Sequence, residues 1–127
     1  MQTALSRKIE DIEMSLDVYL VDKIYEEYTH EQECYWTGNI THNLNKMAMA
    51  VSAYHYLWRP EELGVVYAKD NIINLRQSIG YMYLNYDKLR EMNPENGWGN
   101  VDNLIDFTTE YLKACVKNPE AVIEVCR

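Results

Sequence analysis

The chain has 127 residues, 47% of them hydrophobic, and a formal net charge of −8. This length and composition predict a single domain over residues 1–127, and no apolar window is long enough to span a membrane. The negative charge argues against non-specific nucleic-acid binding, because phosphates would be repelled overall. It suits a protein that offers an acidic face to a nucleic-acid-binding partner, although solubility is the better interpretation of any single acidic patch.

Residues 1–23 hold acidic side chains and no uninterrupted apolar block, so we expect no secretory signal. The three cysteines, Cys34, Cys115 and Cys126, are odd in number and form no CxxC pair. This pattern predicts reduced thiols in a cytoplasm, and neither a disulfide framework nor a zinc site.

Residues 2–15 hold apolar side chains three or four positions apart, which predicts a short N-terminal helix. After it, alternating side chains over residues 18–21 favour a β-strand, with Cys34–Trp36 as its partner. The alternative is a single N-terminal helix that continues to about Tyr28, and the periodicity leaves both interpretations open.

A second helix is expected over residues 43–58, where one apolar stripe recurs at helical spacing. Thr41 or Asn39 would cap its start by accepting a hydrogen bond from an unpaired amide. Pro60 ends it, because the residue before a proline disfavours helical angles, and a short turn up to Gly64 follows.

Residues 66–92 carry the longest helical pattern, and residues 100–117 carry the last one, with Asn100 as its cap. The segment 93–100 is expected to be a loop, since it holds Asn-Pro, Asn-Gly and a tryptophan between two glycines. The β-branched residues of 121–126 predict a short final strand. The expected fold is mainly α, an α+β domain with a small accessory sheet of two or three strands.

Hydrogen-bonding side chains crowd the junction before the second helix, where Asn39, Thr41, His42 and Asn43 fall within five residues and Lys46 follows. A helix start has unpaired amides and a partial positive charge, so this pattern predicts a site for a phosphate, a carboxylate or a polar base edge. The alternative is a heavily capped helix start, although a cap uses only one or two such residues.

A second segment places Trp58 beside Arg59, and an arginine suits phosphate or carboxylate while a tryptophan can stack on a planar ring. For these two residues alone, the better interpretation is structural. Trp58 would then lie in the core, and Arg59 would pair with Glu61, Glu62 or another acid.

The 93–100 loop is the third segment of interest. Asn93 and Asn96 offer amides to a polar ligand. Trp98 is either the hydrophobic anchor of the connector or an exposed group that binds a partner. Trp36 could stack with Trp98 on a planar ligand. Tyrosine is also abundant, with eleven residues against one phenylalanine, which suits a subunit interface or pocket wall and leads us to expect a homo-oligomer.

Patterns typical of enzymes are mostly missing from the sequence. His42 and His55 have no metal-ligand spacing, and there is no GxSxG or Walker motif. Glu10 and Glu13 form one pair of the kind that holds magnesium in helical nucleotide pyrophosphatases, but no convincing second pair exists. We therefore expect no cofactor, no bound metal and no catalytic residue.

The segments TGNITHNLNKMA, LWRPEELG and NPENGWGN, which begin at Thr37, Leu57 and Asn93, resemble a widespread family of small proteins encoded by bacteriophages and prophages. The resemblance covers roughly residues 17–127, and it implies a bacterial host cytoplasm without implying a settled activity. The family often has a short hairpin before its NITHN segment, whereas residues 21–33 here are longer and more acidic. Small acidic phage proteins of this kind often act on host defences.

The sequence therefore predicts a non-enzymatic protein that sequesters a small anionic or nucleotide-like ligand in an infected or lysogenic bacterial host. The alternative is an acidic interaction module that inhibits a host defence protein, and a third class is a cryptic nucleotide-processing enzyme. The expected ligand-binding residues are Trp36, Asn39, Thr41, His42, Asn43, Lys46, Trp58, Arg59, Asn93, Asn96 and Trp98.

Overall fold

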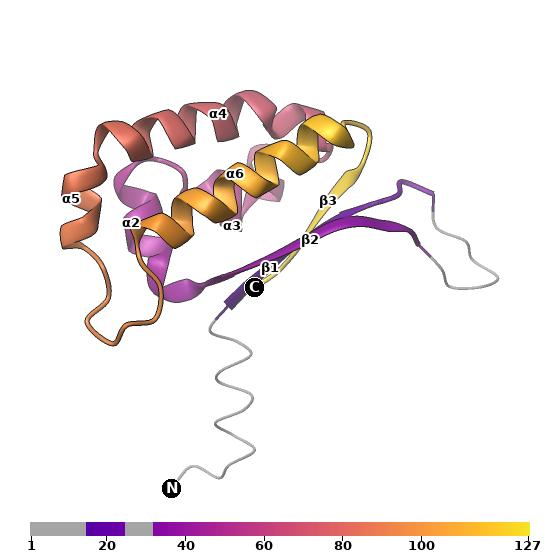
Figure 1. Ribbon diagram of the computed structural model, residues 1–127. Coiled ribbons are helices and arrows are strands. Elements are labelled where there is room, and N and C mark those ends of the chain that lie inside the picture. The colour runs from indigo at the N-terminus through magenta and orange to yellow at the C-terminus, as the bar shows by residue number, and fades with distance from the viewer. Residues whose placement is uncertain (1–14, 25–31) are drawn as a thin grey trace, which may run out of the picture.

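The computed structural model describes residues 15–24 and 32–127, and it shows a small antiparallel sheet packed against helices (Figure 1). Strand β1 (Ser15–Val21) lies in the centre of the sheet, between β2 (Cys34–Thr41) and β3 (Val122–Cys126). The expected combination of helices with a small sheet is confirmed. The expected helix over 2–15 lies outside the described residues, except for Ser15, which begins β1.

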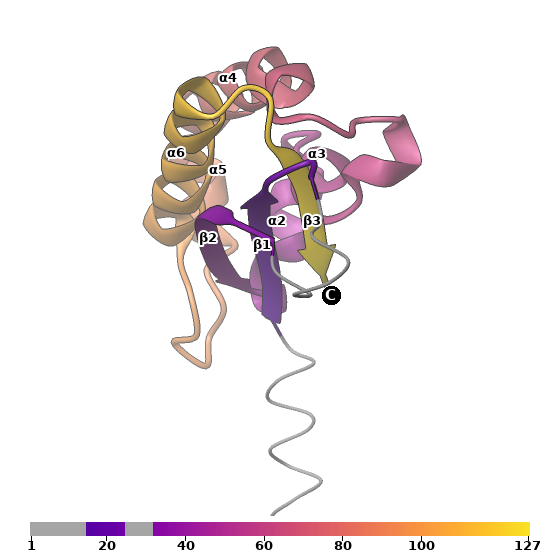
Figure 2. The ribbon, with the colours of Figure 1, turned by 90° about the vertical axis from the view of Figure 1, so that its right-hand side faces the viewer.

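The helical part follows β2 along the chain, and the α4 and α6 helices run side by side over the sheet (Figures 1 and 2). Its elements are the 3-10 turns η1 (His42–Leu44) and η2 (Pro60–Leu63) and the helices α2 (Asn45–Ala50), α3 (Tyr54–Trp58), α4 (Ala68–Leu84), α5 (Tyr86–Glu91) and α6 (Val101–Lys117). Among the described residues, no helix has the length and apolar character needed to cross a membrane.

The sheet buries one face against the helices, as the alternation along β1 predicts. Leu16, Val18 and Leu20 are fully buried, whereas the residues between them are half-buried. The predicted strands over 18–21 and Cys34–Trp36 are confirmed, so a single helix that continues to Tyr28 is wrong. The second strand is longer than expected, because it continues to Thr41.

The predicted single helix over 43–58 is wrong, because the chain turns between α2 and α3. Ser52 has a left-handed φ of 58°, and its N–H donates to the carbonyl of Met49 while the N–H of Ala53 donates to the carbonyl of Ala48. These two bonds form a Schellman motif, which usually has glycine at the left-handed position. Ala48 and Ala53, which hold the apolar positions of this motif, are both fully buried.

The predicted helix over 66–92 is also divided, at Asn85, into α4 and α5. The side-chain amide of Asn85 donates to the carbonyl of Tyr81 at 2.8 Å, and the same carbonyl accepts the backbone N–H of Asn85 at 3.0 Å. The last helix is confirmed, and Asn100 caps it by accepting a bond from the N–H of Asn103 at 2.9 Å. The predicted final strand corresponds to β3.

Candidate functional site

The three sequence segments that stand out meet in the folded chain through buried contacts. Trp58 Nε1 donates a hydrogen bond of 2.7 Å to His42 Nδ1, which joins the first segment to the second. Gly99 joins the third segment to the first. Its φ is 93°, and a Cβ built on it would lie 2.8 Å from Cγ2 of Thr41 and 3.1 Å from Leu44, so only glycine allows this approach.

Most polar side chains of these segments are used inside the fold. Thr41 Oγ1 accepts a bond from the N–H of Asn43, as expected of a cap. Asn39 donates to Asp17 across the sheet at 2.8 Å. In the third segment, the side chains of Asn93 and Asn96 accept bonds of 2.9 Å from the N–H groups of Val101 and Trp98.

The structural interpretation of Trp58 and Arg59 is confirmed. Trp58 is only 1% exposed and stacks on Tyr54, with ring centroids 5.5 Å apart. Arg59 Nε donates to the Tyr54 hydroxyl at 3.1 Å, and its Nη1 lies 3.4 Å from a carboxylate oxygen of Glu62. The bond to Tyr54 raises the pKa of Arg59, and the guanidinium is already paired within the fold.

The other two tryptophans differ in their surroundings. Trp36 is half-buried and stacks on Tyr111, with ring centroids 5.4 Å apart. Trp98 is 54% exposed, so it is not the buried anchor of the connector. Of the two tryptophans that were expected to stack on a planar ligand, Trp36 is therefore held by the core and Trp98 lies exposed in the loop.

Two predicted residues of the junction have polar groups that the fold does not use. The amide nitrogen of Asn43 is buried and finds no hydrogen-bond partner among the described residues. Lys46 is exposed, and within the described part of the chain it forms no ion pair. These two groups are the remaining basis for a small-ligand site at the junction.

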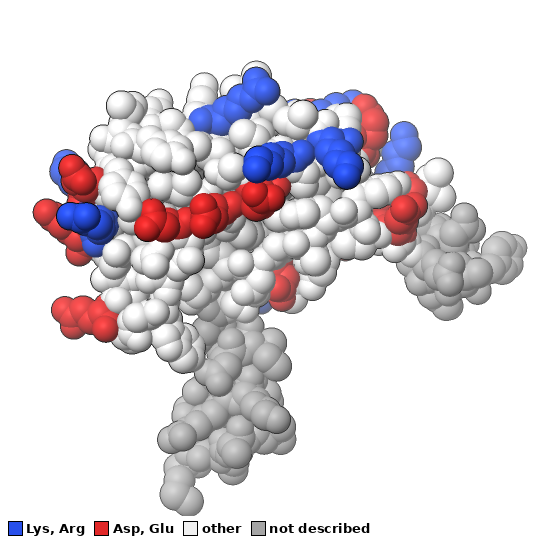
Figure 3. Space-filling model, in the orientation of Figure 1, with Lys and Arg blue, Asp and Glu red and all other residues white. Residues whose placement is uncertain are grey.

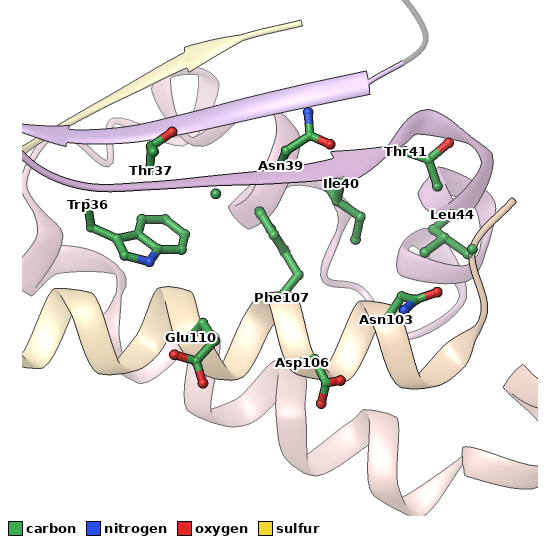
Figure 4. Close-up of a pocket in the computed structure, with 12 residues that line it drawn as sticks. Trp36, Thr37, Asn39, Ile40, Thr41, Leu44, Asn103, Asp106, Phe107 and Glu110 are labelled. Atoms are coloured by element: carbon green, nitrogen blue, oxygen red, sulfur yellow. The ribbon is translucent and has the colours of Figure 1, made fainter.

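A cleft of about 540 Å³ lies between β2 and α6 (Figure 4). Its floor is apolar and is made by Trp36, Ile40, Leu44 and Phe107, and its rim on α6 is polar. The lining residues are Trp36, Thr37, Gly38, Asn39, Ile40, Thr41, Leu44, Gly99, Asn103, Asp106, Phe107 and Glu110. Three residues of the predicted site, Trp36, Asn39 and Thr41, therefore share this cleft.

Gly38 shapes the floor of the cleft. A Cβ built on Gly38 would lie 2.5 Å from a ring carbon of Trp36 and 3.1 Å from Phe107. Glycine at this position therefore lets the Trp36 indole lie across the strand, beside Phe107 of α6 (Figure 4). The close approach of ring to backbone makes the floor continuous from β2 to the helix.

Acidic side chains follow the cleft along α6. Asp102, Asp106 and Glu110 are exposed and recur every four residues, so they lie on one side of the helix, where Figure 3 shows a row of acidic groups. Asp102 accepts a bond of 2.8 Å from the Tyr86 hydroxyl, and this bond raises the pKa of Tyr86. Glu110 lies 3.3 Å from Lys113 on the exposed surface.

The rim of the cleft on α6 is acidic, although Lys113 offsets part of the charge of Glu110. Among the described residues that line it, Asp106 and Glu110 are acidic and none is basic. Asp106 has no hydrogen-bond or ion-pair partner in the described part of the chain, so its carboxylate is available to a ligand. Sequence reasoning missed this rim, although the four-residue spacing of three acids on one helix was visible.

The edge of β2 also borders the cleft. In the described part of the chain, β1 is the only strand that pairs with β2. Every second residue of an edge strand directs its N–H and C=O away from its neighbour, so β2 offers backbone groups as well as side chains.

Among the described residues, no group of three or more His, Cys, Asp or Glu side chains lies close enough together to hold a metal ion. Comparison with protein-family models, with curated proteins and with solved structures finds no match to this chain.

Proposed function

We propose that this protein is a non-enzymatic interaction module that binds a basic segment of another protein in the cleft between β2 and α6. The observation that supports this proposal best is the lining itself, which combines an apolar floor with two acidic side chains and, among its described residues, no basic one. Asp106 would repel an anionic ligand and attract a lysine or arginine, and Glu110 adds to this effect although Lys113 offsets part of its charge.

The two parts of the lining have different roles. Apolar side chains around Phe107 supply the area that a partner buries, and the acidic row on α6 guides a basic partner toward the cleft and selects its charge. The resemblance to phage proteins favours a bacterial host protein as this partner, and inhibition of a defence protein is the biological role that we propose.

The test compares two double variants that remove the same charge at the same spacing. Asp106→Asn with Glu110→Gln neutralises the cleft, and Asp87→Asn with Glu91→Gln neutralises two exposed acids four residues apart on α5. Proteins captured from a bacterial lysate by the wild-type chain should be lost with the first variant and kept with the second. Equal capture by both variants would show that the cleft is not the binding site.

A second candidate function is the sequestration of a small anionic or nucleotide-like ligand at the junction before α2. The observation in its favour is Asn43, whose buried amide has no partner among the described residues, with Lys46 following in the same segment. Native mass spectrometry with a mixture of nucleotides tests it. A bound mass that disappears in Asn43→Ala and Lys46→Ala, and persists in Lys88→Ala, would support this function, and an unliganded mass would reject it.

A further inference from the structure

We infer that the basic segment binds as an added β-strand on the outer edge of β2, which pairs with no other strand among the described residues, and that it carries lysine or arginine at every second position. This inference rests on the proposed function and specifies how the partner is recognised. It combines three observations: the open edge of β2, the position of α6 beside that edge, and the spacing of the acids on α6.

The first observation is the difference between the two edges of the sheet. On the β3 side, the N–H of Ile123 donates to the carbonyl of Val66 at 2.9 Å, and Tyr67 pairs with Val122. These contacts cover the start of that edge. Strand β2 has no comparable neighbour among the described residues, so its outer backbone groups are available for main-chain hydrogen bonds to an extended peptide.

The second observation is the place of α6. Figure 2 shows this helix on the β2 side of the sheet, away from β3, and Figure 4 shows it running along β2 with the cleft between them. A strand added to β2 would therefore direct one set of alternate side chains toward α6. The other set would face away from the helices, since successive side chains of a strand point to opposite faces.

The third observation is a match of spacing. Asp106 and Glu110 are four residues apart on α6, which corresponds to a rise of about 6 Å along the helix. Alternate residues of a strand are separated by about 6.7 Å. Two basic residues at positions i and i+2 of the added strand can therefore meet these two acids in turn.

Lysine and arginine also fit the floor of the cleft. Their aliphatic stems can lie against Trp36 and Phe107 while their charged ends reach the carboxylates on the rim. A basic side chain thus contacts both the apolar and the acidic part of the lining. A purely apolar side chain contacts only the apolar part, and an acidic side chain is repelled by the carboxylates.

The experiment uses two labelled peptides of the same composition, blocked at both ends. One is Thr-Lys-Thr-Lys-Thr-Lys-Thr, and the other is Lys-Thr-Thr-Lys-Thr-Thr-Lys, in which no two lysines are two positions apart. Fluorescence anisotropy with the whole protein should show about two- to fivefold tighter binding of the alternating peptide, because only that peptide can pair one lysine with Asp106 and the next lysine with Glu110. Equal affinities, or no binding of the alternating peptide, would overturn the inference.

A second measurement tests the backbone contacts without changing the protein. Methylation of the peptide nitrogens at alternate positions should abolish binding for one set of positions and leave it for the other, since only one set faces β2. Hydrogen exchange of the β2 amides, followed by NMR, should slow at every second residue in the complex. Equal effects of both methylated peptides, or unchanged exchange in β2, would reject strand addition.

These results separate the inference from the proposed function. If both peptides bind equally well and both lose affinity for the Asp106→Asn, Glu110→Gln variant, the acidic cleft is a binding site but the partner is not an added strand. If this variant binds the alternating peptide and captures lysate proteins as the wild-type chain does, the proposed function fails as well.

Discussion

The hydrogen bond between Trp58 and His42 predicts a large and specific effect on stability. His42→Ala would leave the Trp58 N–H buried without its acceptor, because the indole is only 1% exposed and the bond is 2.7 Å long. An unsatisfied buried donor costs about 1–3 kcal/mol, and the lost packing of the imidazole adds to this. We expect the free energy of unfolding to fall by about 2–3 kcal/mol, so His42→Ala is not a change that affects ligand binding alone.

A double-mutant cycle isolates the contribution of this bond. Trp58→Phe removes the donor but keeps an aromatic ring, and in that background His42→Ala should cost about 1–2 kcal/mol less than in the wild-type chain. Urea denaturation followed by circular dichroism measures all four proteins. If the two changes add to within about 0.3 kcal/mol, the bond does not join the two segments energetically, and our reasoning is refuted.

Three further predictions concern single residues. Ser52→Gly should raise the free energy of unfolding by about 0.5–1 kcal/mol, because glycine adopts the left-handed φ of 58° without strain, and Ser52→Ala should give no gain in the same urea titration. Gly99→Ala should lower it by about 1–3 kcal/mol, since the new Cβ would meet Thr41; an unchanged midpoint would contradict this. Burial raises the pKa of the Cys115 thiol to about 12, so a thiol reagent at mildly alkaline pH should modify exposed Cys34 and Cys126 in the native protein and reach Cys115 only after denaturation. Modification of Cys115 in the native protein would contradict its burial.

The sequence predicts the fold well where each residue choice agrees with the local structure. The helix over 100–117 was predicted to within one residue, because Asn100 caps it and its apolar stripe is continuous. The helix over 43–58 was not, because Ser52 is no recognised helix-ending residue and takes the position that glycine usually fills. The apolar stripe runs through the turn, since both short helices bury the same side against one core.

The candidate site was predicted only in part, for a different physical reason. The junction segment was predicted as a ligand site because of its polar side chains. In the structure, Asn39 mainly bonds across the sheet and Thr41 mainly caps the following turn. The cleft depends on α6 lying beside β2, and this neighbourhood arises from tertiary packing that no local pattern encodes. Asp106 and Glu110 could therefore be recognised as surface acids on a helix, but not as the rim of a cleft.

The central position of β1 also determines when the sheet can be completed. Its pairing with β2 closes a short loop, whereas its pairing with β3 joins Asp17 to Cys126, which is 109 residues later in the chain. Closing such a long loop costs entropy that local contacts do not repay, so folding slower than that of a helical bundle is expected, with the β3 contact formed late. During synthesis, β1 keeps an unpaired edge until residues 122–126 have been made. The nascent chain is therefore most open to wrong strand pairing just before translation reaches its last strand.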